Sequence, residues 1–358
     1  MSFILGLLTL VLLYIVIVQI SKANELIKTL QSDGKEDEES YGNSALYLSV
    51  LGFATIIVSI ASCFYYAPTL LPTPASEQGE WINNLMIVTL VLTSIVFVIT
   101  QFALFWFVYR YHYRKDRKAY FYAHNNKLEI LWTTIPAAVL TILIVFGIQK
   151  WFKIFSPAPK EAIQIEVTGK QYTWMVRYAG RDNTLGKRDF SLVKSDNELG
   201  IDWNDKKSHD DFVPDEIVLP VNKPISINIG ALDVIHNFFL PHFRLMMSAV
   251  PGVPTHLWFR PTITTEEMRK KLNNPKFDYF VACNKLCGSG HYNMQKKVRV
   301  VTQEEFDKWF REQKSYYRWI VQPAIKDGSF KLATPASELK QSLHHNTAAT
   351  HSGTEEKK

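Results

Sequence analysis

Residues 130–149 read ILWTTIPAAVLTILIVFGIQ, and residues 163–167, shortly after them, read IQIEV. The first run has no charged residue and is long enough to cross a bilayer as a helix, because about 20 residues at 1.5 Å each span the hydrocarbon core. The second run alternates apolar and polar residues with the period of two that is typical of a half-buried strand. This stretch therefore predicts a membrane helix that leads into a β domain.

Three earlier runs have the same character as residues 130–149. They cover residues 1–20, 44–71 and 82–109, and none of the four runs contains Asp, Glu, Lys or Arg. The first run could be taken for a signal peptide, but it lacks a basic start and is not followed by a small-residue cleavage pattern. The sequence therefore predicts a membrane α-helical anchor with four spans.

Loop charges predict the orientation of this anchor. The connection after the third span carries six Lys or Arg residues between Arg110 and Lys127, whereas the connection between Pro72 and Trp81 carries none. Cytoplasmic loops are the ones enriched in Lys and Arg, so everything after Gln149 is predicted to lie outside. We expect a multi-pass membrane protein with its β domain on the outer face of the membrane.

The exported half continues with short alternating runs at 225–229 and 298–301. Such runs, separated by Pro and Gly, predict an antiparallel β sandwich or barrel, and residues 304–313 predict a helix that closes it. Residues 194–216 contain eight acidic side chains. We interpret this acidic insert as a solvated loop, with a docking patch for a basic partner as the alternative. The polar tail from about Gln341 is predicted to be disordered.

These patterns predict four regions along the chain. Residues 1–72 hold two extra spans, residues 73–155 a helical hairpin, residues 156–320 the exported domain, and residues 321–358 a C-terminal extension. The apolar residues are concentrated in the first 150 positions, which excludes a single globular domain. A net charge of +6, from 40 Lys and Arg against 34 Asp and Glu, makes no basic stripe, so nucleic-acid binding is not expected.

Soft metal ligands are concentrated in residues 283–294, which read CNKLCGSGHYNM. Two thiols, an imidazole and a thioether favour copper over magnesium or calcium and, because of the methionine, over zinc. His236, far upstream, could supply a second imidazole. A disulfide between Cys283 and Cys287 is one alternative, and a structural Cys2His2 zinc site is another. Two cysteines, two histidines and a methionine suit two copper ions that share both sulfurs.

At these residues the chain resembles subunit II of the haem-copper cytochrome c oxidases. The resemblance covers about residues 80–312 and rests on five segments: LEILWTTIP at 128–136, GKQYTW at 169–174, DVIH at 233–236, AVPG at 249–252, and the CxxxCxxxHxxM loop. It implies a cupredoxin-like Greek-key barrel that holds the dinuclear CuA centre. Such a subunit accepts electrons from cytochrome c, or from a haem domain of a respiratory complex, and passes them on. The acceptor would be haem a in subunit I, which also holds CuB and reduces oxygen to water coupled to proton pumping.

The resemblance also implies a set of copper ligands. Cys283 and Cys287 would bridge the two ions, His236 and Met294 would complete one, and His291 with the backbone carbonyl of Lys285 would complete the other. The family usually has Glu at the position of Lys285, and that carboxylate reaches an interfacial Mg or Mn ion. An ammonium group has no lone pair, so the side chain of Lys285 does not fit such a nonredox metal site.

Three further residues receive roles from the resemblance. Tyr172 and Trp174 match the surface entry for electrons, although strand aromatics considered alone are more often core residues. Glu129 alone would be an acid favoured by a helix N-terminus, whereas the matching Glu of the family lies at the mouth of a proton channel of subunit I. Expected partners are subunit I, other oxidase subunits and membrane lipid. The alternative function is a membrane-anchored structural zinc or single-copper delivery module.

Overall fold

The computed structural model describes all residues except 1, 32–37, 330 and 333–358, so the predicted tail from Gln341 lies outside the described residues. The side chains of residues 2–10, 28–29, 31 and 38–40 also lie outside the description. The chain forms two compact units, which are described separately below. The first comprises Met1–Leu71 with Ile87–Leu140, and the second comprises Pro72–Met86 with Thr141–Lys358.

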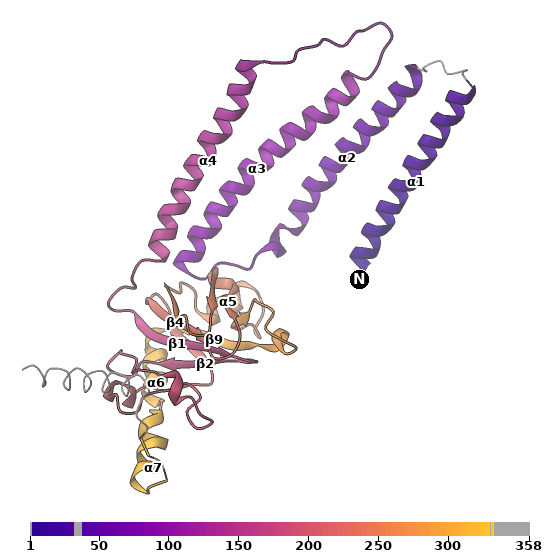
Figure 1. Cartoon of the computed structure of the whole chain (residues 1–358). Helices are drawn as coiled ribbons and strands as arrows, with labels where there is room; N and C mark the ends of the chain where they lie inside the picture. Colours follow the sequence, from indigo (N-terminus) through magenta and orange to yellow (C-terminus); the bar gives the residue numbers. More distant parts are fainter. Residues whose placement is uncertain (1, 32–37, 330, 333–358) are drawn as a thin grey trace, which may run out of the picture. The chain divides into compact units, whose positions relative to one another are not determined.

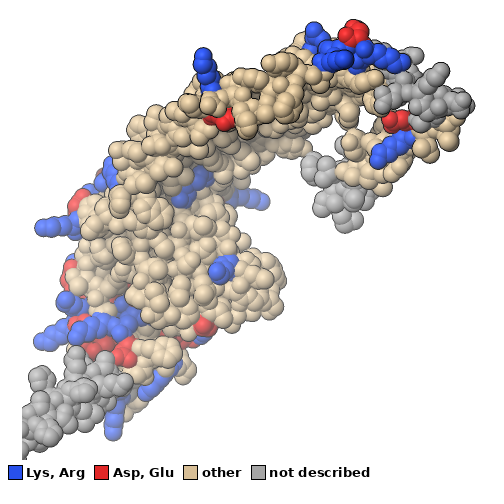
Figure 2. Space-filling view, turned by 45° about the horizontal axis from the view of Figure 1, so that its top comes forward, with Lys and Arg blue, Asp and Glu red and all other residues tan. Residues whose placement is uncertain are grey.

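Four long helices precede the β domain (Figure 1). Three helical segments among the described residues are long and apolar enough to cross a membrane, which confirms three of the predicted spans. They are Tyr41–Leu70, Glu77–Arg110 and Asn126–Ile154. Figure 2 shows an uncharged surface along most of these helices. The first predicted span forms a helix, but it stays a prediction as a span because its first ten side chains are not described. The helices are α1 (Ser2–Gln31), α2 (Glu38–Leu70), α3 (Glu77–Arg110) and α4 (Asn126–Ile154).

Helix α2 packs against α3 within the first unit. The hydroxyl of Ser49 donates a hydrogen bond to the carbonyl oxygen of Phe105 at 2.9 Å. A Cβ atom added at Gly52 would lie 2.2 Å from the Phe105 ring, so only glycine permits this approach. Phe53 adds a ring contact with Phe102 at 5.3 Å between centroids. Small residues allow membrane helices to approach closely, so α2 belongs to the same helical bundle as α3.

The β domain contains a four-stranded and a five-stranded sheet (Figure 1). Their strands confirm all three alternating runs. The predicted antiparallel pairing is confirmed for most neighbouring strands but was wrong for two pairs, because β1 pairs with β4 and β3 pairs with β9 in parallel. The chain between the two strands of each parallel pair is long. Only a short hairpin connection requires its two strands to be antiparallel, so a long connection allows parallel pairing. One sheet has the order β2 (Thr173–Tyr178), β1 (Ile163–Lys170), β4 (Ile225–Ala231), β7 (Thr255–Phe259). The other has the order β3 (Ile217–Pro220), β9 (Gln295–Val301), β8 (Tyr279–Cys283), β5 (His236–Leu240), β6 (Leu245–Ala249).

Side chains from both sheets form one apolar core. Ile165 and Val176 from one sheet and Phe238 from the other are fully buried in it, and each such side chain stabilises the domain by about 1.5–3 kcal/mol. Helix α6 (Gln303–Glu312) confirms the predicted closing helix, and it adds Phe306 to the core. The remaining helical elements are short: η1 (Phe190–Leu192), η2 (Lys206–His209), η3 (Pro241–Phe243), α5 (Thr265–Lys271), η4 (His291–Asn293), η5 (Tyr317–Val321) and α7 (Gln322–Lys326).

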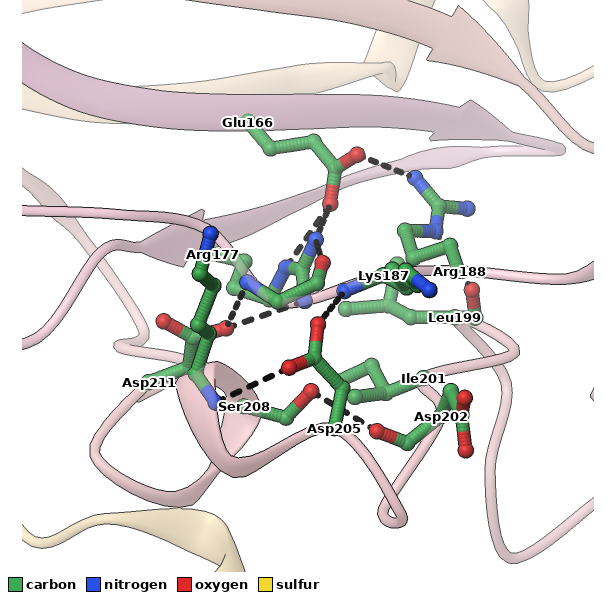
Figure 3. A network of polar contacts seen from close by, with 12 residues as sticks. Glu166, Arg177, Lys187, Arg188, Leu199, Ile201, Asp202, Asp205, Ser208 and Asp211 are labelled. Carbon is green, nitrogen blue, oxygen red and sulfur yellow. Dashed lines mark hydrogen bonds and ion pairs between the residues drawn. The ribbon is translucent and has the colours of Figure 1, made fainter.

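The acidic insert between β2 and β3 is held by polar contacts with residues outside it, so the interpretation as a solvated loop was wrong for its buried acids Asp202 and Asp211 (Figure 3). Asp211 pairs with the buried guanidinium of Arg177 at 3.0 Å, and Arg177 also pairs with Glu166 at 2.8 Å. Asp205 accepts a hydrogen bond from the backbone N–H of Lys187 at 2.9 Å. Asp202 and Asp211 are buried and cannot face a partner, which also weakens the alternative of a docking patch. A count of charges along the insert did not reveal Arg177, because it comes from β2.

A second, smaller apolar cluster joins the insert to the C-terminal segment. Leu199, Ile201 and Trp203 bury against Val321 of η5. The ring of Trp203 stacks on Tyr316 with 5.6 Å between centroids. The insert and the segment after α6 therefore form one lobe on the side of the β domain.

Candidate metal centre

Strand pairing brings the predicted ligands to one end of the five-stranded sheet. Strand β5 begins at His236, and β8 ends at Cys283. The two strands run antiparallel with Phe238 opposite Cys283, so the start of one meets the end of the other. The backbone N–H of Cys283 donates to the carbonyl of Met294 at 3.0 Å, which closes the loop between β8 and β9.

Five of the predicted ligand side chains converge on this loop. The sulfur atoms of Cys283 and Cys287 lie 3.9 Å apart. His236 Nδ1 is 3.8 Å from the sulfur of Cys283, and His291 Nδ1 is 3.6 Å from the sulfur of Cys287. Met294 Sδ lies 3.9 Å from the sulfur of Cys287. The carbonyl oxygen of Lys285 is 3.1 Å from the sulfur of Cys283, while the lysine side chain is exposed.

The environment of the thiols fits a bound cation. Both cysteines are free and buried, and their sulfurs are far from the 2.05 Å of a disulfide bond. Burial, followed by the neighbouring Cys283, raises the pKa of Cys287 to about 11. Two adjacent buried thiolates are costly unless positive charge compensates them. His236, Cys283 and Cys287 bring their ligand atoms within 4.8 Å of one another, which is a suitable cluster for a metal ion.

Asp233 orients one of the imidazoles, and it was missed as a site residue. Its Oδ1 lies 2.8 Å from His236 Nε2, so the other ring nitrogen, Nδ1, is left to face the sulfurs. The backbone N–H of Gln171 donates to Oδ2 of the same carboxylate at 2.7 Å. Burial opposes ionisation of Asp233, but these hydrogen bonds outweigh it and lower its pKa. The signal in the sequence is an acid three residues before a ligand histidine at the start of a strand.

Trp174 and Gly169 enclose the other side of His236. Trp174 is fully buried, and its ring meets the His236 ring edge to face at 5.9 Å. A Cβ atom at Gly169 would lie 2.8 Å from His236 Cδ2, so any larger residue there would displace the imidazole. Trp174 is therefore a core residue that contacts a ligand.

Tyr172 lies directly on the metal loop. Its hydroxyl is 3.3 Å from Ser289 Oγ, and the residue is 38% exposed. Cβ atoms added at Gly288 and Gly290 would each come within 2.5 Å of the tyrosine. Gly288 also has a φ of +135°, which L-residues rarely adopt. The two glycines make room for a partly exposed aromatic ring beside the buried cysteines.

Glu129 belongs to the other unit of the chain. It is exposed in the first turn of α4, and its Oε1 accepts a hydrogen bond from the backbone N–H of Asn125 at 3.4 Å. An acid in this position is favoured by the positive end of the helix dipole. The structure thus gives Glu129 a local role that is compatible with the role implied by the resemblance.

Comparison with known proteins assigns the family. Residues 67–149 match the family described as cytochrome C oxidase subunit II, transmembrane domain, and residues 163–301 match its periplasmic domain. A probable cytochrome c oxidase subunit 2 of Rickettsia felis is 30% identical over 271 residues, covering 73% of this chain and 78% of the relative. The chain belongs to the cytochrome c oxidase subunit II family. It is therefore a membrane-anchored subunit of a haem-copper oxidase with a periplasmic domain of cupredoxin type.

Two other known proteins are similar to this chain. The alternative cytochrome c oxidase subunit 2 of Bradyrhizobium diazoefficiens is 28% identical over 275 residues, which cover 76% of this chain and 92% of the relative. The crystal structure of the periplasmic domain of subunit II from Bradyrhizobium japonicum is 32% identical. It covers 43% of this chain and 94% of its own, with a TM-score of 0.29.

Subunit II in this form carries helices beyond the matched transmembrane domain. That domain begins at residue 67, so α1 and nearly all of α2 precede it. The periplasmic match includes His236, Cys283 and Cys287, which form a copper-type ligand group. Apart from these three residues, the role of each site residue remains a proposal.

Asp233→Asn is expected to weaken metal retention while leaving the fold intact. The neutral amide of Asn would polarise the His236 ring less than the carboxylate does. Loss of such an outer partner of a ligand histidine typically costs about 10- to 100-fold in metal affinity. Competition with a copper chelator measures the effect. Asp196→Asn, in the acidic insert, is the matched control. Equal copper retention by both variants would contradict the role given to Asp233.

Proposed function

We propose that this subunit is the electron-input subunit of its oxidase and that its ligands hold a dinuclear copper centre. One observation carries the proposal: two buried thiols lie 3.9 Å apart, with an imidazole nitrogen within 3.8 Å of each and a thioether 3.9 Å from one. Cys283 and Cys287 would bridge the ions. His236 and Met294 would complete one, and His291 with the Lys285 carbonyl would complete the other. When bound, such a centre supplies one-electron redox chemistry with little change in geometry.

The rest of the pathway is assigned to residues around the loop. We place electron entry at Tyr172, because it is partly exposed and contacts Gly288 and Gly290 of the loop. Trp174 would assist by fixing His236. The donor would be cytochrome c or an equivalent haem protein, and the acceptor would be haem a of subunit I, which with CuB would reduce oxygen and drive proton pumping.

Metal analysis of the purified complex tests this function against its alternative. The proposal expects two copper ions for each subunit II and a mixed-valence signal in the EPR spectrum. One zinc ion, or one copper ion without that signal, would instead support a structural zinc or copper-delivery module. The buried thioether of Met294 argues against zinc, because zinc sites use thiolate, imidazole and carboxylate ligands.

Two finer features of the architecture belong to the same proposal. We take α1 as a fourth span, since its described residues 11–20 are apolar apart from Gln19 and are almost all exposed. We take the two sheets as a closed Greek-key barrel, since strands from both contribute to one core. The domain limits predicted at residues 72, 155 and 320 likewise remain proposals.

Glu129→Gln is expected to slow turnover severalfold while copper content and electron transfer to haem stay unchanged. The reason is that Glu129 would take protons from the cytoplasm, where the basic loop before α4 is predicted to lie. Oxygen consumption across a range of pH, with copper analysis beside it, makes the measurement. Asp116→Asn, an exposed acid of that loop that pairs with Arg114, is the control. If Glu129→Gln shows wild-type turnover at every pH, Glu129 has no role in proton uptake and is only a charge at the membrane interface.

Lys285→Glu is expected to lower the reduction potential of the copper centre. The substitution replaces a positive side chain by a negative one beside the proposed copper centre. Reduction adds an electron to that centre, so a nearby negative charge favours the oxidised state. The backbone carbonyl is retained, and copper content should not change. A redox titration of the copper band measures the shift, and Mn EPR of cells grown in manganese tests for a new cation site. An unmoved potential, or stoichiometric Mn in the wild-type complex, contradicts this account.

A further inference from the structure

A groove of about 750 Å³ opens where the acidic insert meets helix α6 and the C-terminal segment. Phe212, which is buried, and Phe310, which is half-buried, supply apolar walls. Trp319 also lines the groove, and it is 64% exposed. An exposed tryptophan beside an apolar wall is a typical anchor of a protein interface. None of the predicted copper ligands lines this groove.

Four exposed cations line the same groove: Arg181, Lys206, Lys314 and Arg318. None of them has an ion-pair partner among the residues that the structure describes, although the ammonium of Lys314 lies 4.8 Å from the centre of the Trp319 ring. The groove therefore presents unpaired positive charge.

Two acids also line the groove, and each already accepts a backbone hydrogen bond. Asp182 Oδ1 accepts from the N–H of Thr184 at 2.8 Å, and Asp210 Oδ2 accepts from the N–H of Asp182 at 3.2 Å. Four cations against two acids leave the lining net positive. This is the opposite of the charge that the acidic composition of the insert suggests.

Other acids of the insert are buried or paired outside the groove, which explains this excess. Asp211 pairs with buried Arg177, and Asp202 is buried. Glu198 pairs with Lys170 at 3.1 Å, and Glu216 pairs with Arg299 at 2.7 Å. These acids are satisfied elsewhere in the periplasmic domain, so they do not neutralise the groove.

The groove lies away from the metal loop. Gly180, which lines it, follows the end of β2, whereas Tyr172, which contacts the loop, precedes the start of the same strand. A strand of six residues at about 3.3 Å per residue separates the two positions by about 20 Å. A partner that occupies the groove can leave Tyr172 open to an electron donor.

We propose that this groove binds an acidic segment of a periplasmic protein, with an apolar or aromatic residue of that segment placed against Trp319. The excess of positive charge in the groove favours an acidic occupant, because opposite charges face each other across interfaces. The arginine and tryptophan side chains favour a protein occupant, since both residue types are enriched at protein interfaces. A free polyphosphate is a poorer fit, since it would meet Asp182 and Asp210 at short range. The interaction would tether the partner to the oxidase during electron transfer.

The first arm of the test uses a photo-crosslinking amino acid in place of Trp319, in cells that assemble the complete oxidase. We expect a crosslink to a periplasmic protein, mapped by mass spectrometry to a segment rich in Asp and Glu. Arg181→Glu combined with Arg318→Glu should remove at least about nine-tenths of the crosslinked product, because like charges would then face each other. The milder pair Lys206→Gln and Lys314→Gln should reduce it as well.

Matched controls separate the groove from the general charge of the domain. Lys308→Glu combined with Arg311→Glu makes the same change of net charge on exposed positions of α6 that do not line the groove, and it should preserve the crosslink. Copper content and oxidation of excess soluble cytochrome c should stay normal in every variant, so a failure of the proposed electron-input function would be seen separately.

A second arm measures binding to the purified complex with two probes, an acidic peptide of repeated Glu-Glu-Leu and inorganic polyphosphate. The groove double variant should bind the peptide about tenfold more weakly, and added salt should weaken binding to the wild type. Several results would overturn the proposal. They are the absence of a protein crosslink, a crosslink to lipid or to a segment without acids, an equal loss in the control variant, or binding of polyphosphate but not peptide.

Discussion

Cys287→Ser is expected to abolish the mixed-valence copper signal and the oxidation of cytochrome c by the complex. A serine hydroxyl ionises far less readily than a thiol and is a hard ligand, so it cannot bridge two copper ions. The substituted position also lies 3.6 Å from His291 Nδ1 and 3.9 Å from Met294 Sδ, so both copper positions lose a shared contact. EPR and copper analysis of the purified complex make the measurement.

Cys63→Ser is the control for this substitution. Cys63 is a free, exposed thiol on α2, in the unit of the chain that lacks the metal loop. The Cys63→Ser variant should retain full copper content and turnover. Survival of a two-copper, mixed-valence signal in Cys287→Ser would refute the bridging role of Cys287, and the same result in Cys283→Ser would refute that of Cys283.

Arg177→Met is expected to destabilise the periplasmic domain by about 3–5 kcal/mol, because it leaves buried carboxylates without their counter-charge. The side chain of Arg177 is 2% exposed, and it pairs with both Asp211 and Glu166. It also donates to the carbonyl of Gly186, in the segment between β2 and the insert, and Figure 3 shows Arg177 between Glu166 and Asp211. Hydrogen exchange of the β2 amides in the purified complex reports the local loss of stability.

Arg299→Met provides a comparison in which an ion pair is lost at the surface. Arg299 pairs with Glu216 at 2.7 Å, but the two side chains are 36% and 30% exposed. Exposed pairs contribute about 0–1 kcal/mol, so protection from exchange should hardly change. Similar losses in the two variants would mean that the burial of Arg177 has no special effect.

The Arg177 variant should also respond to pH in a defined direction. Burial raises the pKa of Asp211 to about 6 even though Arg177 opposes the shift. A carboxyl whose pKa is higher in the folded state favours folding below its unfolded pKa, and this contribution is lost as the pH rises through about 6. Without Arg177 the cost of ionisation grows. Arg177→Met should therefore regain part of its stability when the pH is lowered from 7 to 5, and Arg177→Met with Asp211→Asn should not show this recovery.

Much of the architecture could be predicted because its signals are local. The absence of charge over 82–109 and 130–149 identified α3 and α4, although both helices extend beyond the apolar runs into polar residues that can still form helical hydrogen bonds. Alternation at 163–167 identified β1. The direction in which β1 pairs with β4 was not available from the same signal, because it depends on the path of the chain between the strands.

The site divides in the same way. Cys283, Cys287, His291 and Met294 fall within one loop, and their spacing alone indicated a metal site. His236 could be named as a candidate from its residue type, but the local sequence could not place it at the sulfurs, because only the pairing of β5 with β8 brings it there. Asp233 was missed because an acid three residues before a histidine can equally cap a turn, so its spacing alone does not show that it orients a ligand. The burial of Asp211 was not predicted for a related reason, since its partner Arg177 is distant in sequence.

The contact of Tyr172 with Gly288 and Gly290 also limits how this protein can change over generations. A Cβ atom at either glycine would lie within 2.5 Å of the tyrosine, so Ala at 288 or 290 is expected to be tolerated only after position 172 has become smaller. A bulkier ring at 172 would in turn press on the loop that contains both cysteines. The three positions are therefore epistatic, and the residue at the proposed point of electron entry cannot be exchanged for a bulkier one without adjustment of the metal loop beside it.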